Sequence, residues 1–185
     1  MSDLNGMKIR ELGGYPSDMW KALGASPLLF NMPDVYDAAS KGVIDGGNLP
    51  WAAMSTYKFY EVMKYYSEAP TTASPQFVIM NKDTWNGLPK DVQDAIMSVS
   101  GITGAEFSGE SGWGADIKTE LLAAAQKAGA NLQSVPLDAG EFDKWKQIAG
   151  KPIWDRWVAD MNSKGLAGQK VMDAALALIN KYKVP

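Results

Sequence analysis

Arg10 is the residue whose type and position best suit binding chemistry. It is one of only two arginines in the chain and ends a predicted strand just before a Gly-Gly pair. A guanidinium presents a planar pair of N–H donors that can hold both oxygens of a carboxylate, which an ammonium group cannot do. Ligands of open α/β sheets lie beyond the carboxyl ends of strands. The alternative is a surface ion pair with Glu11 or Asp18, which would contribute little to stability.

Residues 45–51 (Asp-Gly-Gly-Asn-Leu-Pro-Trp) form a second candidate site. Gly46 and Gly47 carry no Cβ and would let the backbone approach a bound group in a sharp turn. Before them, Gly42 suits the left-handed conformation that ends a helix, and Pro50 suits the first turn of the next helix. Such a turn places main-chain N–H groups beside the Trp51 indole. The pattern predicts a site for a small anionic or polar ligand, with simple packing at the helix start as the alternative role of Trp51.

Two residue types that enzymes often use are missing, since the chain has no Cys and no His. Their absence excludes thiol nucleophiles, histidine general bases, ordinary Cys/His zinc sites and a disulfide scaffold. The sequence also lacks an EF-hand loop, a Walker loop, a Gly-x-Gly-x-x-Gly turn and a closely spaced carboxylate motif. We therefore expect neither enzymatic activity nor a metal or other cofactor.

Composition sets further limits on the class of protein. The 185 residues, 46% hydrophobic and 21% charged, suit one substantial core or two small lobes. A net charge of −3 gives no electrostatic reason to expect nucleic-acid binding. No apolar run reaches the roughly 18–20 residues that span a bilayer. Residues 1–6 lack the basic and apolar regions of a secretory signal, so the signal of an exported protein would lie outside this chain.

The elements around Arg10 alternate between strands and helices. Apolar patterns and breaker residues predict a strand at 7–11, a helix at 16–23, a strand at 27–30 and a helix from 32 to 41. This order at short spacing is typical of an α/β fold with parallel strand pairing. It would place Arg10 at the end of the first strand.

The rest of the chain reads as mostly helical. The pattern predicts strands at 65–69, 76–80 and 131–136, of which 76–80 is the clearest, and helices at 50–64, 84–85, 138–149, 154–162 and 169–182. A long helical region from 89 to 128 contains five glycines between 101 and 114. Each interior glycine costs up to about 1 kcal/mol relative to Ala, so we expect a bent or interrupted helix. The surplus of helices over strands suggests that further strands are supplied from elsewhere.

Several of these segments, taken in order, resemble the solute-binding proteins of TRAP transporters (tripartite ATP-independent periplasmic transporters) of the DctP type. The similar segments are residues 3–10 (Asp-Leu-Asn-Gly-Met-Lys-Ile-Arg), 23–27, 35–39 with 42–46, 59–62 with 64–65, and 80–89. Each motif alone is weak, but the ordered set covers essentially the whole chain.

The resemblance implies a periplasmic-binding-protein-like fold, type II-like, with two α/β lobes and a cleft between them. It implies an extracytoplasmic, periplasmic receptor that binds an organic acid and passes it to TRAP membrane permease subunits driven by an ion gradient. Arg10 matches the family arginine that pairs with the ligand carboxylate. Gly47, Asn48, Leu49, Pro50 and Trp51 match the segment that lines the cleft, and Met32 matches another cleft-facing position.

The chain departs from the family pattern in two places. Many relatives carry Asn directly before this proline, where the chain has Leu49, and Leu49 with Trp51 suggests a more apolar ligand such as an aromatic or branched carboxylate. The chain also starts where family members already have about a hundred residues, so it resembles the C-terminal part of a binding protein. Exposed strand edges would then favour self-association. A stand-alone binding or interaction module without a transport role is the alternative function.

By the same resemblance we expect three parts. Residues 1–70 would form an α/β lobe with the carboxylate-binding strand and the cleft turn. Residues 71–130 would form a hinge strand and the long bent helix, belonging partly to the other lobe, and residues 131–185 a strand and the C-terminal helices.

Overall fold

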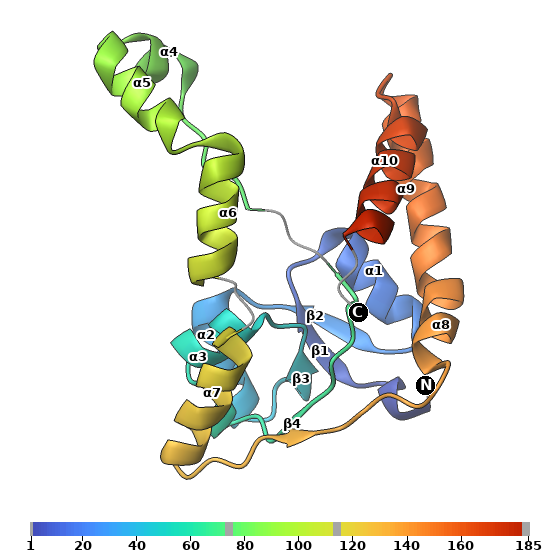
Figure 1. The fold of residues 1–185 in the computed structure, drawn as a ribbon. Helices are drawn as coiled ribbons and strands as arrows, with labels where there is room; N and C mark the ends of the chain where they lie inside the picture. The colour runs from blue at the N-terminus through green and yellow to red at the C-terminus, as the bar shows by residue number, and fades with distance from the viewer. Residues whose placement is uncertain (1, 73–75, 113–115, 183–185) are drawn as a thin grey trace. The chain divides into compact units, whose positions relative to one another are not determined.

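The computed structural model describes residues 2–72, 76–112 and 116–182 (Figure 1). The chain forms two compact units. Unit 1 consists of Met1–Asn48 and Pro136–Pro185, and unit 2 of Leu49–Val135. These units divide the chain at other positions than the three predicted parts, which remain a prediction about the whole protein.

Unit 1 contains a three-stranded parallel sheet in the order β2-β1-β3 (Figure 1). β1 is Lys8–Glu11, β2 is Ser26–Leu29 and β3 is Gly46–Gly47. Helices α1 (Gly14–Ala22) and α2 (Met32–Ser40) connect these strands. Apolar side chains of β1, of α2 and of the residues between elements are buried; they are Ile9, Leu23, Ala25, Val35, Ala38 and Ile44. The predicted strand–helix–strand–helix order with parallel pairing is confirmed.

The C-terminal part of unit 1 is helical. It contains α8 (Glu141–Trp145), a π-helical turn (η3, Lys146–Gly150), α9 (Lys151–Ser163) and α10 (Gly168–Lys181). Trp145 packs edge-on against Trp20 of α1, with ring centroids 6.1 Å apart. Arg156 of α9 forms an ion pair with Asp18 of α1. These contacts attach the C-terminal helices to the helix that follows β1.

Unit 2 is largely helical. It contains α3 (Trp51–Thr56), a 3₁₀ turn (η2, Phe59–Glu61), α4 (Lys82–Asn86), α5 (Lys90–Ser98), α6 (Gly101–Gly112) and α7 (Asp116–Lys127). Strands β4 (Tyr65–Tyr66) and β5 (Gln133–Ser134) pair in parallel. The buried side chains come mainly from α3, η2 and α7 and include Met54, Phe59, Leu121 and Ala125.

The predicted helix over residues 50–64 is wrong in its extent. The helix ends at Thr56, and Lys58 adopts a left-handed conformation with φ 52°. This reversal lets the chain bury Phe59 completely. Burial of a large aromatic side chain outweighs the modest cost of one left-handed residue.

The predicted strand over residues 76–80 is also wrong. The segment forms no strand, and Phe77, Val78 and Ile79 are largely exposed. A strand requires a hydrogen-bonding partner, and an apolar run alone does not supply one. The prediction of an interrupted helical region is confirmed, since α5 ends at Ser98 and α6 begins at Gly101, which has φ 66°.

Candidate functional site

The carboxyl ends of β1 and β3 form the candidate site in unit 1. β1 is the central strand of the order β2-β1-β3. The chain passes from β1 to β2 on one side and then returns to β3 on the other side. Such a reversal between adjacent parallel strands is where open α/β sheets bind ligands. Arg10 pairs with Gly47 in this register, and the Asn48 backbone N–H donates to the Arg10 carbonyl at 3.3 Å.

Arg10 is a buried charge with an incomplete set of hydrogen bonds. Its side chain is 1% exposed, and its Nε donates to the Phe30 carbonyl at 2.9 Å. Its Nη2 is buried and has no hydrogen-bond partner among the described residues. Burial lowers the pKa of Arg10 and the charge of Glu11 raises it, but an arginine stays charged in proteins. Because buried polar atoms are rarely left unpaired, Nη2 suits an acceptor supplied by a ligand.

The surface ion pair considered for Arg10 is not found. Arg10 is buried, and Asp18 instead pairs with Arg156. Glu11 is also buried and accepts hydrogen bonds from the Leu12 backbone N–H, the Trp20 indole and the Asn48 amide, at 2.9, 3.2 and 3.2 Å. The Asn48 side chain is therefore directed toward Glu11.

The sharp turn predicted at Gly46 and Gly47 is wrong. These two residues form β3, which pairs with β1, and neither has a positive φ. A Cβ on Gly46 would meet the Ile9 Cδ1 at an ordinary 3.7 Å, so no close backbone approach requires this glycine. Hydrogen bonding to β1 decides the conformation here. The left-handed Gly42 after α2 is confirmed, with φ 67°.

Met32 is the first residue of α2 and is half-buried. It lies two residues after Phe30, whose carbonyl holds Arg10. The structure therefore brings Arg10, Gly47 and Asn48 together at one sheet edge, with Met32 beginning the helix that follows the neighbouring strand.

Leu49, Pro50 and Trp51 belong to unit 2. Leu49 is half-buried, and Pro50 is exposed and directly precedes α3. Trp51 is half-buried and meets the Tyr66 ring edge-to-face, with centroids 5.1 Å apart and an interplanar angle of 81°. Packing at the helix start is thus one role of Trp51.

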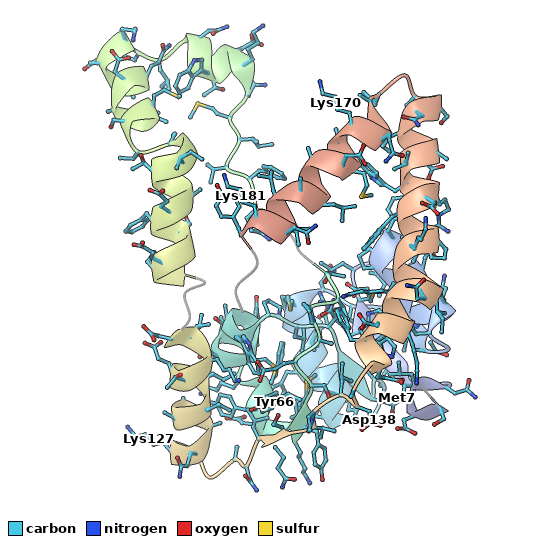
Figure 2. The ribbon with its side chains drawn as sticks, turned by 45° about the vertical axis from the view of Figure 1, so that its right-hand side comes forward. Met7, Tyr66, Lys127, Asp138, Lys170 and Lys181 are labelled. Carbon is cyan, nitrogen blue, oxygen red and sulfur yellow. The ribbon has the colours of Figure 1, made fainter. Side chains whose placement is uncertain are left out.

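A cation also lies beside these rings. Lys118 Nζ is 5.7 Å from the Trp51 ring centroid and 5.8 Å from that of Tyr66, which Figure 2 labels. It also binds Glu68 at 2.5 Å, a hydrogen bond that raises the Lys118 pKa. Sequence reasoning missed Tyr66, Glu68 and Lys118. No local pattern links residues from β4, the following loop and α7.

Two general features limit the chemistry of the described residues. No group of three or more acidic side chains within residues 2–72, 76–112 and 116–182 could hold a metal ion. No helix in the same ranges has the length and apolar character needed to cross a membrane.

Comparison with known proteins decides the family. A sequence profile described as DctP, bacterial extracellular solute-binding protein, family 7, matches residues 1–160. The chain belongs to the DctP family. The predicted α/β fold, resembling periplasmic binding proteins and helix-rich toward the C-terminus, is confirmed by solved TRAP solute-binding proteins that superpose on nearly all of the chain.

Three DctP-related proteins show the degree of similarity. A marine metagenome TRAP solute-binding protein specific for aromatic acid ligands, in complex with metahydroxyphenylacetate, is 29% identical with a TM-score of 0.81, over 99% of this chain and 57% of that one. A TRAP solute-binding protein from Rhodoferax ferrireducens, in complex with copurified benzoate, is 31% identical with a TM-score of 0.73, over 97% of this chain and 56% of that one. The C4-dicarboxylate-binding periplasmic protein DctP of Rhodobacter capsulatus is 29% identical over 83% of this chain and 44% of that protein.

The chain therefore spans about half the length of the DctP relatives that it matches. The match to the family profile covers residues 1–160, so it includes Arg10 and the strands β1 and β3 beside it.

Proposed function

We propose that this chain is part of the solute-binding receptor of a TRAP transporter and that Arg10 binds the carboxylate of an organic acid. The observation that carries the proposal is the buried Arg10 guanidinium with its unpaired Nη2 at the β1–β3 edge. A carboxylate would supply the missing acceptor and the opposite charge together. Membership of the DctP family supports the same conclusion.

The residues that follow β3 favour a ligand with one carboxylate and an apolar body. The Asn48 amide already donates to Glu11, and the family resemblance implies an Asn at the position of the apolar Leu49. Two similar proteins hold metahydroxyphenylacetate and benzoate, which are aromatic monocarboxylates. We therefore favour an aromatic monocarboxylate, and Met32, Gly47, Asn48, Leu49, Pro50 and Trp51 remain proposed ligand-binding residues.

The family supports three further parts of the proposal. The whole protein would act in the periplasm, would deliver its ligand to TRAP membrane permease subunits, and would bind its ligand without converting it. Solute-binding proteins are receptors, and the chain has no Cys or His to serve as nucleophile or general base.

Calorimetric titration with benzoate, metahydroxyphenylacetate and a C4-dicarboxylate tests the proposal. We expect the aromatic acids to bind more tightly than the dicarboxylate. Arg10→Ala should weaken aromatic-acid binding at least about 30-fold, because removing one partner of a buried charge pair costs about 2–5 kcal/mol. Arg10→Lys should restore only part of the affinity, since an ammonium cannot form the paired hydrogen bonds.

Arg156→Gln is the matched control, because Arg156 is the other arginine and pairs with Asp18 on the surface of unit 1. It should bind the aromatic acids like the unchanged chain. Equal affinity of the Arg10→Ala variant would refute the role of Arg10, and the absence of binding by all three acids would refute the proposed function of this chain.

A further inference from the structure

Arg10 and Glu11 are neighbouring opposite charges that are both buried. They are consecutive residues of β1, with side chains 1% and 5% exposed. Consecutive residues of a strand point to opposite faces of the sheet. The two charges therefore lie on either side of the same strand, at the edge where the ligand site is proposed.

Within the part of the chain that the structure describes, the hydrogen bonds of Glu11 all come from neutral donors. They are the Leu12 backbone N–H, the Trp20 indole N–H and the Asn48 side-chain amide. Three donors satisfy a buried carboxylate in its ionised form. None of these bonds involves the Arg10 guanidinium, whose Nε donates to the Phe30 carbonyl and whose Nη2 has no acceptor among the described residues.

We propose that Glu11 is the countercharge of Arg10 in the empty site, and that it limits the affinity for an anionic ligand. Its countercharge role is inferred from the burial of two opposite charges at adjacent positions of β1, and its effect on the ligand rests on the proposed function. A buried cation without a compensating charge is costly, so Glu11 stabilises the empty protein. An arriving carboxylate then becomes a second negative charge near Glu11, and like charges repel strongly where water is excluded.

Glu11→Gln separates this role from a purely structural one. Glutamine keeps the side-chain length and one oxygen that can accept from Trp20 and Asn48, but it removes the charge. If Glu11 is the countercharge, the variant is less stable when empty and binds an anion more tightly. A residue that only supports the fold would lower stability and affinity together.

The first test measures the coupling between the two residues without a ligand. Urea unfolding is recorded for the unchanged chain, Glu11→Gln, Arg10→Met and the double variant. The hydrogen bond that Gln cannot make to the Leu12 N–H is lost in both backgrounds and cancels in the cycle. We expect Glu11→Gln to lower the folding equilibrium constant about tenfold more when Arg10 is present than when Met replaces it. Equal effects in both backgrounds would overturn the proposal.

Folding failure is also informative in this cycle. If Glu11→Gln alone is unfolded and the double variant is folded, the countercharge role is supported. If both are unfolded, Glu11 is needed for its hydrogen bonds and the proposal is overturned.

The second test measures benzoate binding by calorimetry. Glu11→Gln should bind benzoate several-fold more tightly than the unchanged chain. Glu11→Asp keeps the charge but shortens the side chain, so it should lose stability without a gain in affinity. Glu120→Gln, which removes an exposed carboxylate of α7, should match the unchanged chain.

Equal or weaker benzoate binding by Glu11→Gln would overturn the affinity-limiting role. If no variant and not even the unchanged chain binds benzoate, metahydroxyphenylacetate or a C4-dicarboxylate, the proposed function fails. The unfolding cycle then decides the countercharge role by itself.

Discussion

At the end of β1, the side chain of Glu11 connects three segments of unit 1, which are β1, α1 and the residue after β3. Trp20 of α1 donates its indole N–H to Glu11 Oε2 at 3.2 Å and packs edge-on against Trp145 of α8. Asn48, which follows β3, donates to the same carboxylate oxygen at 3.2 Å. Glu11 thus connects α1 with the residue that follows β3, directly beside the buried Arg10.

Replacing Trp20 with Phe tests this connection. The variant keeps an aromatic ring against Trp145 but leaves Glu11 with one donor fewer. We expect the free energy of unfolding in urea to fall by about 1–3 kcal/mol, which is the cost of leaving a buried acceptor short of a partner. Trp154→Phe, at a partly exposed position on α9, should change it far less. Equal losses in both variants would contradict the role of the indole N–H.

At the scale of elements, the ends of helices and strands position the candidate site. α2 ends before Gly42, which has φ 67° and leads the chain back toward β3. The Asp45 carboxylate accepts the Lys8 backbone N–H at 2.8 Å, which attaches the start of β3 to the start of β1. The two-residue strand β3 then runs beside Arg10 without needing glycine-specific angles.

Two Gly→Ala substitutions should have opposite effects on stability. At Gly42 a Cβ in the left-handed conformation costs about 1–2 kcal/mol, so Gly42→Ala should lower the free energy of unfolding. Gly109 lies inside α6 without a positive φ and, apart from its chain neighbours and the helix backbone, no described atom lies within 4 Å of the place that a Cβ would take. Gly109→Ala should stabilise α6 by up to about 1 kcal/mol. Amide hydrogen exchange measures the first effect in α2 and the second in α6. A loss of protection in both helices would contradict the expected stabilisation of α6 by Gly109→Ala.

At the scale of the whole molecule, one segment stands out by its exposure. Phe77, Val78 and Ile79 are 79%, 104% and 89% exposed, and they are consecutive. An exposed apolar run that forms no strand within its own chain is a candidate for pairing with another chain. Self-association of this chain, which its sequence led us to expect, remains a prediction. We expect residues 77–79 to form the contact.

Val78→Lys tests that location. Sedimentation velocity over a range of concentrations should show association of the unchanged chain and less association of this variant, because a buried unpaired ammonium is costly at an interface. Val171→Lys, on the exposed face of α10, introduces the same charge at another exposed apolar position. If Val171→Lys reduces association and Val78→Lys does not, residues 76–80 are not the contact.

The sequence by itself determined the local elements and the identity of the main candidate residue. Periodic apolar residues and breaker residues act over one or two turns, so the first strand, α1, β2 and α2 were predictable. Arg10 was identifiable as a candidate because a guanidinium at a strand end can hold a carboxylate, although a surface ion pair was the alternative, and the ordered motifs indicated the family.

Only the tertiary structure decided what depends on residues far apart in the chain. Pairing with β1 makes Gly46 and Gly47 the strand β3. Residues 76–80 form no strand, because an apolar run needs a neighbouring strand to pair with. The burial of Arg10 and Glu11 follows from packing of β1 with its neighbours, which no local pattern encodes. The physical reason is the same in each case: hydrogen bonding and exclusion of water around these residues depend on segments 20 to 40 positions away, such as Phe30 and Asn48.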